Sequence, residues 1–354
     1  MGFGMSTYEL LADLPIVVEG YELEGHEVSF SSEFVRKTTV IRLHGSGEEG
    51  VGEDVTYAVE DQEALQRAGT GRWPLAGRWT LASFAEHLRS LDLFPQPTDR
   101  PEFRLYRNWA FDSAALDLSL RQAGTTLHAA LGRDCEPLRF VASLRLGEPP
   151  SLQPLLRRLE IAPGLRFKLD PTPSWDDKLI ARLVALGAVD SVDLKGQYEG
   201  TIVDNPADPD LYRRVVEAFS DAWIEDPKLT PETEDVLLAH RSRVTWDAPI
   251  HSIADIEALP WPPLTLNIKP SRLGGLQSLL DVYDYCAAHN IGCYGGGQSE
   301  LSVGRGQIQY LASLFHPDAP NDVAPAGFNL PSPPGDLPSS PLTPSPAALG
   351  FRWG

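Results

Sequence analysis

Five polar residues recur at intervals that match the length of a strand–helix unit. Lys168, Asp193, Glu225, Asp247 and Lys269 each follow a short apolar segment, at spacings of 25, 32, 22 and 22 residues. In a barrel of parallel strands, the residues that end the strands gather at one mouth, where active sites lie. Three carboxylates there would form an oxygen cage suited to Mg²⁺, with Mn²⁺ as the alternative ion. The two lysines, on the second and sixth strands, would flank the bound ligand from opposite sides.

Each of these residues also has an ordinary structural interpretation. A single Asp or Glu after a strand commonly caps the following helix or is solvated in a loop. A single lysine at the end of a strand commonly lies on the surface. Suitable residue types on five consecutive predicted strands favour one shared site over five separate structural roles.

The elements that would position these residues are strands alternating with helices. Short apolar strands are expected at 138–147, 164–171, 189–196, 221–227, 243–249, 264–271 and 291–297, with helices at 175–187, 210–220 and 274–290. Seven such units in series predict a (β/α) barrel. A doubly wound open sheet is the alternative, but no GxGxxG motif follows an early strand.

The first part of the chain has a different pattern. Residues 21–60 are typical of antiparallel strands, the glycine-rich segment 45–53 predicts a hairpin turn, and residues 79–94 and 109–131 predict helices. A sheet followed by helices indicates a small α+β domain. We therefore expect an α+β domain over 1–130, a barrel over 131–330 and a proline-rich tail over 331–354 that returns towards the first domain.

Charge and cysteine content exclude some classes of protein. The 354 residues include 30 Lys and Arg against 49 Asp and Glu, a net charge of −19, which argues against nucleic acid and anionic membranes as partners. Three cysteines without a CxxC motif favour a reduced, cytoplasmic setting. We find neither the pattern of a signal peptide nor an apolar run long enough to span a membrane.

Over residues 20–330 the sequence resembles the enolase superfamily, specifically its muconate-lactonizing subgroup and mandelate racemase-like members. The similar segments are the capping-domain hairpin VRKTTVIRLHGSGEEGVGE, the KxK-like strand RFKLDP, the metal-ligand segments VDLKG, WIEDP and TWDAPIHS, the sixth-strand motif LNIKPSRLGGL and the glycine-rich YGGGQSELSVGRG.

The resemblance implies a (β/α)7β-type modified TIM barrel with an N-terminal α+β capping domain. The hairpin tip, around Phe34 to Lys37 and Gly50 to Asp54, would close over the barrel mouth. Mg²⁺ would be bound by Asp193, Glu225 and Asp247. Lys168 would remove the proton α to a carboxylate, and Lys269 would stabilise the enediolate or protonate its other face. Four further residues would surround the substrate, namely Arg166, Lys195, Ser271 and Glu300.

The chain departs from the family pattern at several of these positions. Arg166 replaces the first lysine of the KxK strand, and together with the metal it would lower the pKa of Lys168. Lys195 stands where relatives often carry Asn, which adds a third cation beside the metal. Asp226 and Ala248 replace a common Gln and a common acid, and the sequence does not indicate what these changes select.

For the overall reaction the resemblance favours a dehydratase of the o-succinylbenzoate synthase kind, acting on a small carboxylate. An amino-acid or dipeptide epimerase and a cycloisomerase are the alternatives within the superfamily. A barrel without catalytic activity that binds a carboxylate is the alternative from a different class, with Lys195 as its best argument. Because relatives are often symmetric oligomers, a homo-oligomer is also an expectation.

Overall fold

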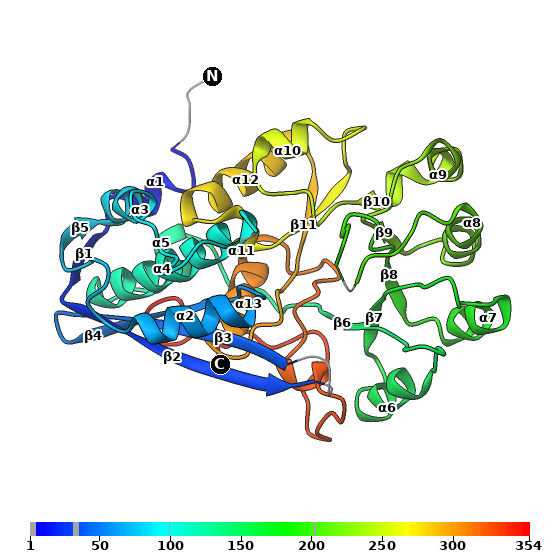
Figure 1. The fold of residues 1–354 in the computed structure, drawn as a ribbon, viewed down its shortest axis with the longest axis horizontal. Helices are drawn as coiled ribbons and strands as arrows, with labels where there is room; N and C mark the ends of the chain where they lie inside the picture. Colours follow the sequence, from blue (N-terminus) through cyan, green and yellow to red (C-terminus); the bar gives the residue numbers. More distant parts are fainter. Residues whose placement is uncertain (1–4, 31–34, 99, 202) are drawn as a thin grey trace.

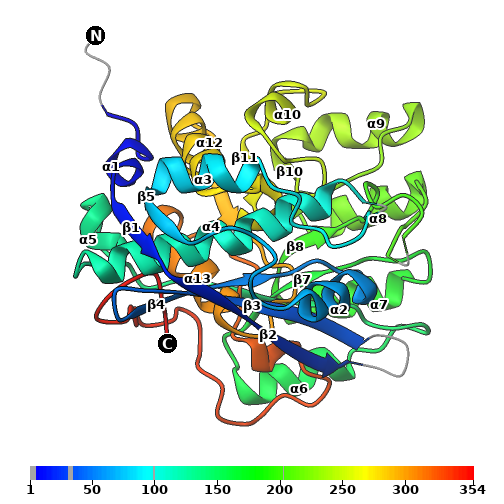
Figure 2. The same cartoon turned by 60° about the vertical axis from the view of Figure 1, so that its left-hand side comes forward.

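The protein consists of an antiparallel sheet with helices, packed against a ring of parallel strands (Figures 1 and 2). The computed structural model describes residues 5–30, 35–98, 100–201 and 203–354. One large apolar cluster contains side chains of both parts, from Leu11 in the first to Leu314 in the second. No helix in these described ranges is long and apolar enough to cross a membrane.

The first part contains five strands and five helices in its described residues. They are α1 (Glu9–Ala12), β1 (Pro15–Val18), β2 (Gly20–Ser29), β3 (Val35–Gly45), β4 (Glu48–Asp54), α2 (Val59–Ala68), β5 (Gly77–Thr80), α3 (Leu81–Arg89), α4 (Glu102–Gln122) and α5 (Leu127–Leu131). Strands β2, β3 and β4 form an antiparallel sheet in that order, and β1 pairs with β5. The expected antiparallel segment at 21–60 is therefore confirmed, whereas Phe34 at the expected hairpin tip lies outside the described residues.

The hairpin between β3 and β4 turns more tightly than the sequence predicted. Only Ser46 and Gly47 connect the strands, and both have positive φ angles, of 53° and 78°. A two-residue loop with positive φ at both positions matches the twist of the flanking strands. The predicted turn at 45–53 is therefore wrong in extent, because its glycine-rich second half is strand β4.

The glycines of β4 allow the sheet to approach helix α4 closely. A Cβ atom added to Gly50 would lie 2.2 Å from the carbonyl oxygen of Ala114, and one added to Gly52 would lie 2.1 Å from that of Ala110. Real Cβ atoms do not approach backbone oxygen so closely, so these positions require glycine. The sequence pattern predicted that Gly50 and Gly52 lie in a turn. In the structure they are the residues of β4 that contact α4.

Replacing Gly52 by alanine should destabilise the fold, because strand β4 and helix α4 would have to separate. We expect Gly52→Ala to lower the free energy of unfolding by about 2 kcal/mol or more in denaturant titrations. Gly20→Ala is the matched control in strand β2 of the same sheet, since a Cβ there would meet nothing within 4 Å. Equal stability of the two variants would contradict this account of the glycines.

The long helix predicted at 109–131 is two helices in the structure. Helix α4 begins seven residues earlier, at Glu102, and ends at Gln122. Gly124, with φ of 65°, follows its end, and Thr126 then caps α5 by accepting a hydrogen bond from Ala129 N. The left-handed glycine ends the first helix, as it does at many helix C-termini.

The described residues of the second part form seven parallel strands, each within one of the predicted segments. They are β6 (Val141–Leu144), β7 (Arg166–Leu169), β8 (Val189–Asp193), β9 (Trp223–Glu225), β10 (Val244–Thr245), β11 (Thr265–Ile268) and β12 (Gly292–Gly295). Strands β6 to β10 are paired in sequence order, and β11 pairs with β12. Hydrogen bonds from Asn267 N to Trp246 O, 3.1 Å, and from Thr245 to Thr265 O, 3.0 Å, connect β10 to β11.

The ring is closed by a short segment that occupies the eighth strand position. Asn321 bridges to Phe140 beside β6, and Asp322 bridges to Gly296 beside β12, both in parallel orientation. The Asn321 side chain accepts a hydrogen bond from Gly295 N and donates to the carbonyl oxygens of Arg139 and His316. A single amide side chain thus joins the two edges that a regular eighth strand would join.

Helices follow the strands and cover the outside of the ring, as α6 to α9 do along β7, β8 and β9 (Figure 1). They are α6 (Gln153–Ile161), α7 (Asp177–Leu186), α8 (Pro209–Ala218), α9 (Pro231–Leu237), α10 (Ile253–Glu257), α11 (Pro270–Leu273), α12 (Leu276–His289) and α13 (Val303–Phe315), with 3-10 helices at Leu238–Arg243 and Ala326–Asn329. Helix α11 is a single turn between Lys269 and Gly274.

The proline-rich end of the chain is bound along both parts. Leu342 exchanges backbone hydrogen bonds with Leu138, of 2.7 and 2.9 Å. Phe351 is fully buried, its N–H donates to Asp117 of α4, and Arg352 forms an ion pair with the same carboxylate. These contacts hold the tail against α4 and the start of the barrel.

His316, beside the closing segment, should make stability depend on pH. Burial lowers the pKa of His316 to about 4, although its hydrogen bond to Asn321 acts in the opposite direction. Between pH 6.5 and 4 the unfolded chain binds a proton at this histidine and the folded chain does not, so stability falls as pH falls through this window. Between pH 7 and 4.5 the parent should lose up to about 3 kcal/mol more than His316→Gln in denaturant titrations. Parallel pH profiles would contradict this assignment.

Candidate active site

The five residues of the predicted site all lie at or just beyond the carboxyl ends of the barrel strands. Lys168 lies within β7, Asp193 and Glu225 end β8 and β9, Asp247 follows β10, and Lys269 follows β11. Lys168 and Lys269 are 1% and 7% exposed, and the three carboxylates are fully buried. Because β7 and β11 are four positions apart in a ring of eight, the two lysines belong to opposite sides of the mouth.

The Lys168 ammonium group is surrounded by carboxylates. It forms an ion pair with Glu225, and its Nζ lies 3.1 Å from Asp193 Oδ2 and 3.6 Å from Asp322 Oδ2. The sequence did not identify Asp322, because the closing segment that positions it has no strand pattern. Lys168 is therefore placed to touch whatever the two carboxylates Asp193 and Glu225 bind.

The Asp247 carboxylate is held on the other side by two cationic side chains and one hydroxyl group. Lys269 Nζ lies 2.8 Å from Asp247 Oδ2, and the Tyr198 hydroxyl donates to the same oxygen at 2.9 Å. Arg272 Nε lies 3.4 Å from Oδ1. Tyr198 and Arg272 were not identified from the sequence, although Arg272 lies in the KPSRLGG segment that carries the family resemblance.

Gly296 leaves space for the side chain of Lys269. A Cβ on Gly296 would lie 2.7 Å from Lys269 Cε and 2.4 Å from the side-chain oxygen of Asn267. The glycine-rich segment after β12 therefore has a steric role, since it leaves room for the lysine of the neighbouring strand.

The group of carboxylates that could hold a metal ion differs from the predicted set of ligands. Oxygens of Asp193, Glu225 and Asp226 lie within 4.8 Å of one another, and they form the group that could hold a metal ion. Asp226 has a positive φ of 48°, and its carboxylate accepts hydrogen bonds from Asp247 N and Ala248 N, at 2.8 and 2.9 Å. Asp193 and Glu225 are thus brought together as predicted, Asp226 is the third member, and the ligand role of Asp247 stays a prediction.

The donor set fits a small divalent cation. All three groups are buried carboxylates, the hard oxygen ligands that Mg²⁺ prefers. Nearby, Asp247 Oδ1 is buried and accepts no hydrogen bond in the structure. The residues present are therefore chemically suited to the metal that members of the enolase superfamily use.

Burial, reinforced by the neighbouring carboxylates, raises the pKa of two of these groups. Burial, opposed by Lys168 and reinforced by Asp193 and Asp247, raises the pKa of Glu225 to about 8. Burial and the neighbouring carboxylates raise the pKa of Asp226 to about 7. For Asp193 burial acts in the same direction, but Lys168 and Lys195 outweigh it and hold its pKa below the usual range.

The side chains around Lys168 raise its pKa, contrary to the expectation that Arg166 would help to lower it. Burial lowers the pKa of Lys168, but the charges of Asp193 and Glu225 outweigh burial and raise it well above its ordinary value. The expectation relied on two cations beside Lys168, a metal ion and Arg166. The structure does not place Arg166 there.

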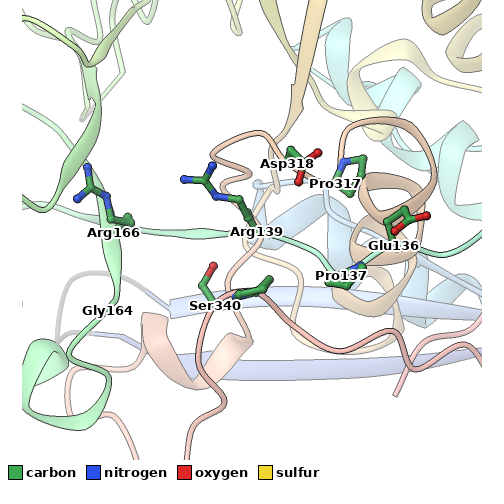
Figure 3. Close-up of a pocket in the computed structure, with 9 residues that line it drawn as sticks. Glu136, Pro137, Arg139, Gly164, Arg166, Pro317, Asp318 and Ser340 are labelled. Carbon is green, nitrogen blue, oxygen red and sulfur yellow. The ribbon is translucent and has the colours of Figure 1, made fainter.

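Arg166 lies at the opposite end of the barrel from the carboxylates. Its guanidinium forms an ion pair with Asp190, with Nε 2.8 Å from Oδ1, and lines a pocket of about 450 Å³ that includes Arg139 and Ser340 (Figure 3). The reason is geometric, because residues two apart on a strand point to the same side but are about 6.6 Å apart along it. The structure therefore does not bring Arg166 into the candidate site.

The other three predicted residues are close to the site. Lys195 forms an ion pair with Asp193, and Ser271 is buried in the turn α11 beside Lys269. Glu300 pairs with Arg305 at 3.0 Å and accepts a hydrogen bond from Gln298 N.

Two side chains of the first part hold the segment around Glu300. Glu53 of β4 is buried and accepts hydrogen bonds from the N–H groups of Leu301, Ser302 and Gly304, at the beginning of α13. Arg36 of β3 donates to the carbonyl oxygens of Gln298 and Ser299. The strands of the β3–β4 hairpin are thus attached to the barrel beside the mouth, and the closing of this segment over the mouth stays a prediction.

Comparison with known proteins identifies the family. A family model described as domain of unknown function DUF8230, C-terminal domain, matches residues 134–330, and the corresponding N-terminal domain matches residues 9–130. The chain belongs to this family.

The chain is also similar to characterised proteins. It is 29% identical to an N-succinylamino acid racemase of Amycolatopsis sp. over 84% of this chain and 81% of the relative. It is 27% identical to the o-succinylbenzoate synthase of Bacillus subtilis (strain 168) over 60% of this chain and 57% of the relative.

Solved structures share the fold. An enolase superfamily member from Listeria innocua matches with a TM-score of 0.62 and 19% identity, over 88% of this chain and 86% of that one. Muconate lactonizing enzyme from Pseudomonas putida matches with a TM-score of 0.62 and 18% identity, over 87% and 88%. These structures confirm the predicted fold class, and together with the relatives they confirm the predicted resemblance to enolase superfamily enzymes, which include lyases and isomerases.

The two candidate ligand sets can be separated by single substitutions. If Asp226 completes the site, Asp226→Asn should weaken Mg²⁺ binding about tenfold or more in calorimetric titrations, because a carboxylate of the cluster is lost. Asp190→Asn, at the other end of the barrel, is the control and should bind as the parent does. Normal binding by Asp226→Asn together with a loss in Asp247→Asn would instead favour the predicted set with Asp247.

Proposed function

We propose that the protein is a Mg²⁺-dependent enzyme that removes a proton α to the carboxylate of a small substrate. The observation that carries this proposal is the position of two buried lysines, Lys168 and Lys269, on opposite sides of a cluster of buried carboxylates. A planar enediolate between them would present one face to each ammonium or amine group. The proposed metal ligands are Asp193 and Glu225, with Asp226 or Asp247 as the third.

The residues of the chain have separate tasks in this reaction. Lys168, on β7, accepts the α-proton as the general base in its neutral form, which requires another cation to offset the Asp193 and Glu225 charges that raise its pKa. Bound Mg²⁺ would supply positive charge that acidifies the α C–H bond of a coordinated carboxylate. Lys269, held beside Asp247 and given room by Gly296, stabilises the negative charge that develops on the substrate.

The overall reaction that we favour is dehydration of the o-succinylbenzoate synthase kind. The α C–H bond breaks, its electrons form a C=C bond, and the C–O bond at the β carbon breaks. Lys168 then returns the proton to the departing hydroxide, which leaves as water. Similarity to o-succinylbenzoate synthases and the KPSRLGG segment, which includes Lys269 and buried Ser271 and Arg272, support this choice.

Racemisation of an N-succinylamino acid is the second candidate. Two relatives that align over more than four fifths of both chains are N-succinylamino acid racemases. Racemisation needs a proton donor on the face opposite the base, and Lys269 has that position relative to Lys168. A cycloisomerase would use the same two lysines, and a barrel that binds a carboxylate without turnover would need neither as a base.

The two lysines should separate these reactions. With each enantiomer of an N-succinylamino acid in D₂O, a racemase should lose α-proton exchange of one enantiomer in Lys168→Ala and of the other in Lys269→Ala, as followed by proton NMR. In a dehydratase, Lys269→Ala should slow water loss from the hydroxylated precursor of o-succinylbenzoate by about 10²-fold, because a fixed positive charge is lost. Lys269→Arg should then restore part of the rate.

Lys178→Ala is the control, since Lys178 is an exposed residue of α7. If turnover were unchanged in both Lys168→Ala and Lys269→Ala, proton abstraction by this pair would be wrong. A complete absence of Mg²⁺ binding by the parent would contradict the metal requirement.

A further inference from the structure

The Lys195 ammonium group lies beside the carboxylate cluster formed by Asp193, Glu225 and Asp226. Its Nζ forms an ion pair with Asp193 Oδ2, and Asp193 is one of the three carboxylates that could hold a metal ion. The Asp193 carboxylate is fully buried and the Lys195 side chain is only 13% exposed. A surface lysine that left such a contact would be solvated by water and lose little free energy. The Lys195 ammonium group is largely buried and needs another acceptor nearby.

The backbone is arranged to bring the lysine there. Lys195 has a φ of 54°, a left-handed conformation that costs a residue with a side chain about 1 kcal/mol. Its own N–H donates to Asp193 Oδ1 at 3.1 Å, so both carboxylate oxygens are bound by one residue. The Tyr198 ring faces the ammonium, with 4.9 Å between Nζ and the ring centroid.

A second acceptor for the ammonium lies next to the first. Asp170 Oδ1 is 3.9 Å from Lys195 Nζ, and Asp170 is 7% exposed. This oxygen is buried and has no hydrogen-bond partner among the described residues, whereas Oδ2 is 3.3 Å from Arg145 Nε. The unpartnered oxygen is where the ammonium can go when it leaves Asp193.

We propose that Lys195 is a built-in cation that binds Asp193 in the metal-free protein, and that Mg²⁺ binds only when this ammonium moves to Asp170. The inference depends on the proposed function for the identity of the metal. It follows that Lys195 lowers the affinity for Mg²⁺ and stabilises the protein in its absence, because it neutralises a carboxylate that would otherwise be repelled by its neighbours.

The test compares Mg²⁺ binding and thermal unfolding of the parent and Lys195→Met, which keeps the length of the side chain and removes its charge. We expect the variant to bind Mg²⁺ at least tenfold more tightly in calorimetric titrations. Its unfolding temperature should be lower than that of the parent without Mg²⁺ and should rise more steeply with added Mg²⁺. Lys195→Arg should resemble the parent, and Lys178→Met controls for the loss of a lysine elsewhere.

A second variant keeps the test informative if Lys195→Met does not fold. Asp170→Asn removes the charge that would receive the ammonium, so it should weaken Mg²⁺ binding several-fold while Asp193 is unchanged. Unaltered affinity in this variant would contradict a movement of Lys195 to Asp170.

The outcomes separate this inference from the proposed function. Equal or weaker Mg²⁺ binding by Lys195→Met than by a parent that binds Mg²⁺ would overturn the role of Lys195 and leave the proposed function in place. Binding by Lys195→Met but not by the parent would support the role of Lys195 and contradict a Mg²⁺-dependent reaction in the parent. Absence of binding in both would overturn both proposals.

Discussion

The pairing of buried carboxylates with buried ammonium groups is the interaction on which the barrel interior depends. Asp193, Glu225 and Asp247 are fully buried, and removing such charges from water costs several kcal/mol each. Lys168 compensates two of them and Lys269 the third. The same lysines and carboxylates would take part in the proposed reaction. The ion pairs that allow these charges to be buried are therefore the contacts that a bound metal ion and substrate would have to replace.

Two sets of contacts in the surrounding fold hold the elements that carry these ion pairs. One closes the barrel, and the other attaches the first sheet to its mouth. Asn321 joins the first and seventh strands where a regular eighth strand is absent, and it places Asp322 beside Lys168. At the mouth, Glu53 and Arg36 attach the first sheet to the segment that follows β12. These contacts use backbone N–H and C=O groups of the barrel, so they depend on the path of the chain more than on particular barrel side chains.

The sequence predicted those features that repeat along the chain and missed those created by single backbone conformations. Seven strands and the positions of Lys168, Asp193, Glu225, Asp247 and Lys269 at their ends follow from apolar periodicity and spacing. Asp226 lies next to a predicted ligand, but its approach to Asp193 requires a positive φ that no sequence pattern indicates. The strand nature of Glu48–Asp54 was hidden because its glycines serve close packing against α4.

Arg166 shows why a resemblance must be transferred residue by residue. In the family pattern its position belongs to the KxK strand, yet here a guanidinium at the start of β7 binds Asp190 at the start of β8. Since these two residues lie on adjacent strands and far from the cluster, Arg166 does not add positive charge beside Lys168. The extra cation of this chain is Lys195, on the loop after β8, where it contacts a carboxylate of the cluster directly. Besides the changes at Asp226 and Ala248, the site therefore differs from the family pattern in having the cation Lys195 on the loop at its mouth.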